Sequence, residues 1–376
     1  MAWWRRALHP VVGLVLGAGA VCGGARAMVF LATDDPAHNT TPPAGDLTDS
    51  GWQWQGNWRG FVGTPIAPEW FITARHLAGN VGESFHFAGE SYRTTAVFND
   101  AASDLTLWRV CGRFPTFAPL YGGNDEVGRE CVMFGRGRGR GAPVVVTNET
   151  GVAVLRGWEW GGGNGTLRWG RNRVAALEAY GGTLDGLLSA TFDEDGGPDE
   201  AMLTGGDSGG GLFIRRDSRW ELAGVAFAVD GPFRLSADGE NLHAALFDMT
   251  GLFVEEDGVW MRVPWQAGPQ PAALYATRIA ARREWILATI AANPEPSDPP
   301  ELQAAADVTG PYATVAATAD PAAQTLRLPT PAGPAFYRLA SCRPTRVLRL
   351  ERDGADLVFH YELADEVQAR TVKAQP

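Results

Sequence analysis

Short apolar runs, broken by glycine, proline and asparagine, dominate the first three quarters of the chain. Runs of this length that are rich in Val, Ile, Phe, Trp and Thr are typical of β-strands. They predict strands over 61–66, 70–74, 91–98, 105–110, 131–134, 144–147, 151–156, 183–192, 210–215 and 221–229. These strands do not alternate with helical segments, so the pattern favours an all-β sandwich or barrel over a parallel sheet.

The periodicity changes near Tyr275. Beyond it, apolar residues recur at helical spacing on one face, namely Ile279, Ile286 and Ile290. This pattern predicts an amphipathic helix over 277–292, which Pro294 would end.

Proline dominates the next segment, 294–300, and proline-rich segments form stiff, extended spacers. We place a linker at 294–303 and a small β-rich, sandwich-like module at 304–376. Within the module, Asp353-Gly354 separates two alternating segments, which predicts a hairpin. The module shows no catalytic constellation, and we expect it to bind a surface partner or to dock on the first domain.

The N-terminus has the composition of a secretory signal peptide. Arg5 and Arg6 precede an apolar stretch over 11–21, and Ala25-Arg26-Ala27 follows as a cleavage site. The apolar stretch is too short to span a membrane. We expect residues 1–27 to be removed and the protein to be secreted, into the periplasm or the extracellular space. The two arginines also permit twin-arginine export, although their flanking residues fit that route poorly.

The net charge of −11 argues against nucleic acid as a partner. The basic run 136–141 is short, and we interpret it as a solvated loop. The acidic segment 193–200 fits no calcium-loop spacing and is interpreted in the same way. We expect neither a metal site nor a cofactor.

The candidate chemistry lies in the segment 205–210, where glycines flank Asp207 and Ser208. Glycines let the backbone turn sharply and leave N–H groups pointing outward. A serine hydroxyl becomes a nucleophile when a base takes its proton and a further group orients that base. His76 ends an apolar run and Asp104 begins an alternating strand, so both residue types are present upstream.

These motifs resemble those of the trypsin-like (chymotrypsin-like) serine proteases. Segment 73–76, Thr-Ala-Arg-His, is similar to the motif around the family's histidine, 104–107 to that around its aspartate, and 206–210 to that around its serine. Gly211 stands where the family has proline, and Leu77 where it has cysteine. Segments 220–225 and 273–286 resemble the strand after the serine and the closing strand and helix. The resemblance covers about 28–293.

The resemblance implies two six-stranded Greek-key β-barrels with a C-terminal helix, all-β in class, and a secreted serine endopeptidase of bacterial type. It implies that Ser208 is the nucleophile, His76 the general base and acid, and Asp104 the group that orients the imidazole. The backbone N–H groups of Gly206 and Ser208 would form the oxyanion hole. Protein or peptide would be the substrate.

Two further residues acquire roles through the same resemblance. In the family, an aspartate at the position of Asp207 often pairs with a newly exposed N-terminal amine. Cleavage after Ala27 would expose Met28, so we hypothesise that the Met28 ammonium pairs with Asp207 and that export activates the protein. The alternative is that Asp207 finds an arginine or backbone donors nearby.

Signal removal would leave Cys111, Cys131 and Cys342, and an odd number requires a free thiol or an intermolecular bond. The family often pairs the position of Cys131 with that of Ile214, so that bridge cannot form here. Cys111 is a partner for Cys131 only at a Cα separation of about 4.4 to 6.8 Å; otherwise Cys131 is buried and unpaired. We expect packing, not crosslinks, to hold the fold.

Specificity is implied by the positions that line the family's pocket. Met202 stands where trypsins carry aspartate, and Phe227, Ala228 and Val229 replace a Ser-Trp-Gly wall. We therefore expect a narrow, apolar pocket that takes small or medium apolar side chains before the scissile bond, and not Arg or Lys.

Two other functions stay open. A protease-fold protein with a blocked pocket would be a catalytically silent binding protein, and the bulky wall residues favour that alternative. An esterase would use the same triad. The order His, Asp, Ser and the absence of a strand–helix alternation in the sequence both argue against an esterase of the α/β-hydrolase class.

Overall fold

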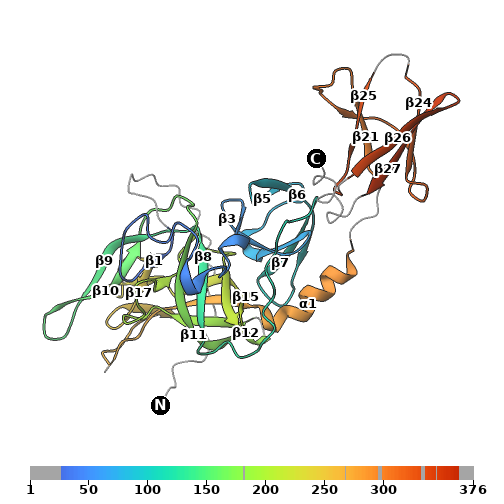
Figure 1. Cartoon of the computed structure of the whole chain (residues 1–376). Coiled ribbons are helices and arrows are strands. Elements are labelled where there is room, and N and C mark those ends of the chain that lie inside the picture. Colours follow the sequence, from blue (N-terminus) through green and yellow to red (C-terminus); the bar gives the residue numbers. More distant parts are fainter. Residues whose placement is uncertain are drawn as a thin grey trace. The chain divides into compact units, whose positions relative to one another are not determined.

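The computed structural model describes residues 27–180, 183–266, 268–294, 299–331, 335–343 and 345–363. The expected signal peptide, apart from Ala27, lies outside the described residues. The chain divides into two compact units (Figure 1). The first consists of the chain up to Arg109 together with Phe114–Thr289, and the second of Val110–Arg113 with the chain from Ile290 onward.

Six antiparallel strands close the first barrel of unit one, in the order β2-β3-β4-β7-β6-β5. They are β2 (Gly56–Trp58), β3 (Phe61–Ala67), β4 (Trp70–Ala74), β5 (Ser84–Phe87), β6 (Glu90–Asn99) and β7 (Leu105–Val110). Aromatic rings fill its interior: Phe71 stacks on Phe85 at 4.0 Å, and Trp58 lies 4.7 Å from Trp108. Burial of side chains this large provides much of the free energy that holds such a barrel together.

The second barrel has the order β11-β12-β20-β15-β14-β8. Its strands are β8 (Glu130–Gly135), β11 (Arg168–Tyr180), β12 (Thr183–Thr191), β14 (Gly211–Arg216), β15 (Arg219–Val229) and β20 (Ala273–Arg278). Numbered one to six along the chain, the strands of both barrels follow the same cyclic order, one-two-three-six-five-four. This repeated Greek-key order confirms the expected all-β class and the two-barrel architecture.

Further strands are attached to the second barrel in unit one. β1 (Val29–Phe30) pairs with β13 (Ala201–Met202). One three-stranded sheet contains β9 (Arg140–Thr147), β10 (Ala153–Trp160) and β17 (Ala244–Leu246). Another contains β16 (Phe233–Arg234), β18 (Phe253–Glu256) and β19 (Val259–Arg262). Three short 3₁₀ helices are η1 (Gly45–Leu47), η2 (Trp52–Trp54) and η3 (Arg75–Leu77).

The helix predicted over 277–292 is observed as α1 (Ile279–Ala292), two residues shorter at its start because β20 continues to Arg278. Among the described residues, no helix is long and apolar enough to cross a bilayer.

The ten predicted strands are all present, with ends that shift by a few residues. Three barrel strands were not predicted, namely β2, β5 and β11. In β11, Ala175, Ala176, Leu177 and Glu178 favour a helix in isolation. Pairing with β8 and β12 overrides this local preference.

Unit two is a small β-sandwich. One sheet has the order β22-β21-β25, formed by β21 (Glu301–Ala305), β22 (Ala313–Thr314) and β25 (Phe336–Ala340). The other has the order β23-β24-β27-β26, formed by β23 (Thr318–Asp320), β24 (Thr325–Pro329), β26 (Thr345–Asp353) and β27 (Asp356–Leu363). β26 and β27 are the predicted hairpin. The linker assignment of 294–303 needs correction, since β21 already begins at Glu301.

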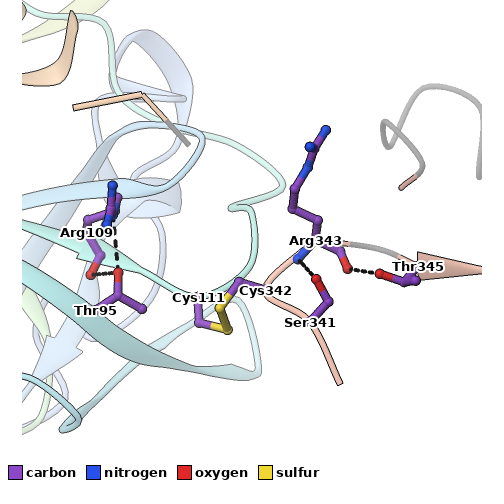
Figure 2. Close-up of a disulfide and its surroundings, with 7 residues drawn as sticks. All are labelled: Thr95, Arg109, Cys111, Ser341, Cys342, Arg343 and Thr345. Carbon is purple, nitrogen blue, oxygen red and sulfur yellow. Dashed lines mark hydrogen bonds between the residues drawn. A yellow bond between two sulfur atoms is a disulfide. The ribbon is translucent and has the colours of Figure 1, made fainter. Parts of the chain in front are cut away.

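A disulfide joins Cys111 to Cys342 (Figure 2). Cys111 follows β7, and Cys342 precedes β26. Next to it, Arg109 hydrogen-bonds Thr95, while the Arg343 N–H donates to Ser341 Oγ at 3.1 Å. The expectation that no crosslink holds the fold is therefore wrong. The partner of Cys111 lies in the other predicted domain, 231 residues away in sequence, and spacing along the chain does not show which cysteines are close in space.

Cys131 is buried and unpaired, which was one of the two alternatives. It faces Ile214 across the β8–β14 pair, and its thiol donates to the Asn172 carbonyl at 3.4 Å. Burial raises the pKa of this thiol far above its usual range. The thiolate is therefore disfavoured, as is typical of a structural, buried cysteine.

Candidate active site

Two neighbouring strands position His76 and Asp104. The five residues of β4 are all buried, and β4 ends at Ala74 where the 3₁₀ turn η3 carries His76. Asp104 directly precedes β7, and β7 pairs with β4 so that Leu105 lies opposite Ala74. Because the pairing places the end of one strand beside the start of the other, the two side chains meet at one edge of the first barrel.

A glycine-rich turn between β13 and β14 carries Ser208. The Gly210 N–H donates to the Asp207 carbonyl at 3.1 Å, and the Gly209 N–H to the Ala226 carbonyl at 3.0 Å. Gly209 has a φ of +79°, and a Cβ there would lie 2.2 Å from Thr73 Oγ1. The turn therefore requires glycine at this position, both for its backbone angle and for its contact with β4.

The His76 imidazole lies between the other two side chains. Its Nε2 atom is 2.8 Å from Ser208 Oγ, and its Nδ1 atom is 2.6 Å from Asp104 Oδ2. The backbone N–H of His76 also donates to Asp104 Oδ1 at 3.0 Å. With Nδ1–H donated to the carboxylate, Nε2 presents its lone pair to the hydroxyl. The arrangement can accept the Ser208 proton and stabilise the imidazolium that results.

Burial differs along this chain of hydrogen bonds. The Asp104 side chain is 8 % exposed, whereas that of His76 is 24 % exposed. A shielded carboxylate interacts strongly with its neighbour, because little water screens it. The ring remains open to an approaching molecule.

The two amides expected to form an oxyanion hole belong to the same turn. Within the described part of the chain, neither the Gly206 nor the Ser208 amide donates a hydrogen bond to a protein acceptor. Gly206 has a φ of +105°, an angle that other residues rarely adopt. Both N–H groups are thus available for an external acceptor.

Asp207 points away from Ser208 into a fully buried site. Its carboxylate accepts hydrogen bonds from the Gly137 N–H and the Thr204 N–H, both at 2.7 Å, and from Thr204 Oγ1 at 2.8 Å. The backbone N–H of Met28 is another donor. Burial raises the pKa of Asp207 to about 6, although these donors oppose the rise. Local backbone donors thus exist, as the alternative expected, and the Met28 nitrogen is one of them.

The N-terminal segment reaches Asp207 as part of the folded core. Met28 is 1 % exposed, and Val29 pairs with Met202. The Arg140 guanidinium hydrogen-bonds the carbonyls of Phe30 and Leu31 and lies 3.7 Å from the centre of the Trp158 ring.

The interpretation of 136–141 as a solvated loop is therefore wrong. Arg136 donates to the Gly165 carbonyl at 2.7 Å, and its burial lowers its pKa. The glycines between the arginines let the backbone of this run approach Asp207 and Thr204 closely enough to donate hydrogen bonds to both.

The four residues expected to line a specificity pocket do not all lie together: one is in the core and three are on β15. Met202 has no exposed surface and belongs to the core of the second barrel. Ala228 and Val229 end β15 and are half-buried. The Phe227 ring lies 6.2 Å from the His76 ring and 4.9 Å from the Tyr180 ring.

Sequence reasoning missed Tyr180. The residue ends β11, and no motif marks it. Burial and the nearby Asp104 carboxylate raise its pKa, whereas Arg75 opposes the rise. Tyr180 and Phe227 together form an aromatic wall on one side of His76.

The acidic segment lines a surface depression. A cavity of about 380 Å³ is lined by Asp193, Glu194, Asp195, Phe247 and Pro269. In the described residues, no three His, Cys, Asp or Glu side chains are grouped so as to hold a metal ion. Glu200 departs from the expected solvated loop: it is buried, accepts hydrogen bonds from Asn172 and the Asp193 N–H, and burial raises its pKa to about 8.

Comparison with known proteins gives a likeness in structure but none in sequence. No protein-family model and no curated protein matches the sequence. Among solved structures, the chain is similar to neuropsin, a serine protease expressed in the limbic system of mouse brain. The two are 15 % identical, with a TM-score of 0.40, and the match covers 64 % of this chain and 96 % of neuropsin. At this identity and TM-score the likeness says nothing about activity.

Proposed function

We propose that the protein is a serine endopeptidase that cleaves peptide bonds through an acyl-enzyme. The proposal rests on the hydrogen-bonded series Asp104–His76–Ser208, with its 2.6 and 2.8 Å contacts. A hydroxyl held at this distance from a shielded imidazole–carboxylate pair is what nucleophilic attack on a carbonyl requires.

In the proposed reaction, His76 Nε2 takes the Ser208 proton as Oγ attacks the peptide carbonyl. The Gly206 and Ser208 N–H groups stabilise the negative oxygen of the tetrahedral intermediate; one such donor typically contributes about 3 to 4 kcal/mol. His76 then gives the proton to the leaving amine. Water then attacks the acyl-enzyme in the same way: His76 takes the proton of the water and gives it to Ser208 Oγ as the acid is released.

We further propose that the mature chain begins at Met28 and is secreted. The burial of Met28 and its hydrogen bond to Asp207 support a role for a Met28 ammonium in ordering the turn that holds Ser208. The Cys111–Cys342 disulfide supports an oxidising compartment, since such bonds rarely persist in the cytosol.

The test is covalent labelling of the mature protein with a fluorophosphonate. We expect Ser208 to be labelled and Ser208→Ala to be unlabelled, with peptide hydrolysis reduced on the order of a million-fold. Thermal unfolding of the variant checks that it is folded. A folded wild-type protein that neither reacts nor cleaves peptides would instead be the catalytically silent binding protein.

A further inference from the structure

The loop between β6 and β7 ends at Asp104 and is organised around a buried carboxylate, Asp100. The Asp100 side chain is 3 % exposed. Its oxygens accept hydrogen bonds from the Ala102 N–H at 3.1 Å and from Ser103 Oγ at 2.6 Å. These contacts fix the backbone of the residues that lead directly into Asp104.

The counter-charge of Asp100 comes from a residue 182 positions later in the chain. Arg282 lies in the first turn of α1 and binds Asp100 with two parallel contacts: Nε to Oδ2 at 2.5 Å and Nη2 to Oδ1 at 2.7 Å. The Arg282 side chain is 17 % exposed. Two-point pairing between guanidinium and carboxylate sets orientation as well as distance.

Arg75 holds the same loop from its other side. Its guanidinium donates to the Asp100 carbonyl at 3.0 Å, and its N–H donates to the Asp104 carbonyl at 2.8 Å. Arg75 is the immediate neighbour of His76. The loop is therefore fixed by η3 on one side and by α1 on the other, and the residue it delivers is the one that orients the imidazole.

We propose that Arg282 is a positioning residue for the triad, which acts through Asp100 to fix Asp104 against His76; the inference rests on the proposed function. Removal of the guanidinium leaves a buried carboxylate without its counter-charge. The loop then relaxes toward solvent, and Asp104 loses its fixed orientation. The helix that closes unit one thereby contributes to the reactivity of Ser208.

The test compares Arg282→Gln with Arg283→Gln, since Arg283 is the exposed arginine beside it on α1. The rate of fluorophosphonate labelling is measured well below the unfolding temperature of each variant. We expect Arg282→Gln to lower the rate at least tenfold and Arg283→Gln to leave it within twofold of wild type. Arg282→Lys keeps the charge without the two-point contact and should give an intermediate rate.

A second readout separates positioning from general stability. In the wild-type protein, a proton shared by His76 and Asp104 should give a far-downfield NMR resonance, which Arg282→Gln should shift or abolish and Arg283→Gln should preserve. A folded Arg282→Gln variant with wild-type labelling and an unchanged resonance would overturn the role of Arg282. If that variant does not fold, a wild-type rate and resonance in Arg282→Lys overturn it equally. A wild-type protein that is never labelled would refute the proposed function itself.

Discussion

At the residue scale, Asp207 lies in an environment that disfavours its negative charge. It is fully buried, and four donors around it do not compensate for its loss of hydration, because its pKa still rises from 3.8 to about 6. A carboxylate in this state is stabilised further by a positive charge. The Met28 nitrogen, which already touches it as an amide, would carry that charge after cleavage.

This predicts a difference between a chain that begins at Met28 and one that carries two extra residues before it. In the extended chain, the unfolded state loses its proton near pH 3.8 and the folded state near pH 6. The contribution of Asp207 to the free energy of unfolding is therefore fully present below pH 3.8. It falls by about 3 kcal/mol as the pH rises through 6. Urea unfolding between pH 4 and 7 measures the fall.

In the chain that begins at Met28, the ammonium should reduce this fall and raise peptidase activity strongly. Asp207→Asn in the extended chain is the control, because it should remove the pH dependence. Equal activity and equal pH dependence of the two chains would show that Met28 has no such role.

At the element scale, the strands matter for what their ends present. β11 carries Tyr180 to the Phe227 ring on β15, and Phe227 in turn contacts His76. In the proposed peptidase, two rings on one side of the imidazole would restrict the substrate side chains that can lie there. Tyr180, which lies outside the family's motifs, is therefore added to the residues that we expect to line the narrow, apolar pocket.

Tyr180→Ala should therefore widen specificity. We expect kcat/KM for substrates with Phe or Leu near the scissile bond to rise about tenfold relative to those with Ala, since a bulky side chain gains room worth roughly 1 to 3 kcal/mol. Tyr180→Phe keeps the ring and is the matched control. Peptide libraries varied at the two positions before the bond measure the change; a wild-type preference for Arg or Lys would contradict the apolar pocket.

At the scale of the whole molecule, covalent connections tie the second unit to the first. The chain passes between units at Arg109–Val110, at Arg113–Phe114 and at Thr289–Ile290. The short segment Val110–Arg113, which contains Cys111, belongs to the second unit, and the disulfide spans 231 residues of sequence. In the chain-entropy description, a closure of this length stabilises the folded state by roughly 5 kcal/mol.

A cut in the proline-rich segment should thus leave the two parts joined. We predict that a site for a specific protease, inserted between Pro296 and Ser297, gives fragments that migrate together on a non-reducing gel and separate after reduction. With Cys342→Ser, the fragments should separate under both conditions. Separation of the cut wild-type chain without reductant would disprove the crosslink.

Local sequence was enough to identify most of the barrel strands, the closing helix and the three side chains of the candidate site. Strand alternation and glycine-rich turns are properties of neighbouring residues, so they can be read without a fold. The motifs around His76, Asp104 and Ser208 are equally local. β11 was missed for the same reason: its local composition favours a helix, and only its partner strands make it a strand.

Tertiary structure decided everything that depends on residues brought together from distant positions. The bond between Cys111 and Cys342, the pairing of Arg282 with Asp100 and the packing of Tyr180 on Phe227 each join segments far apart in the chain. The residues next to either partner in the sequence do not indicate the other partner, because a contact energy depends on distance in space. The chain order alone determined which chemical groups are available, and the closing of the two barrels determined which of them touch.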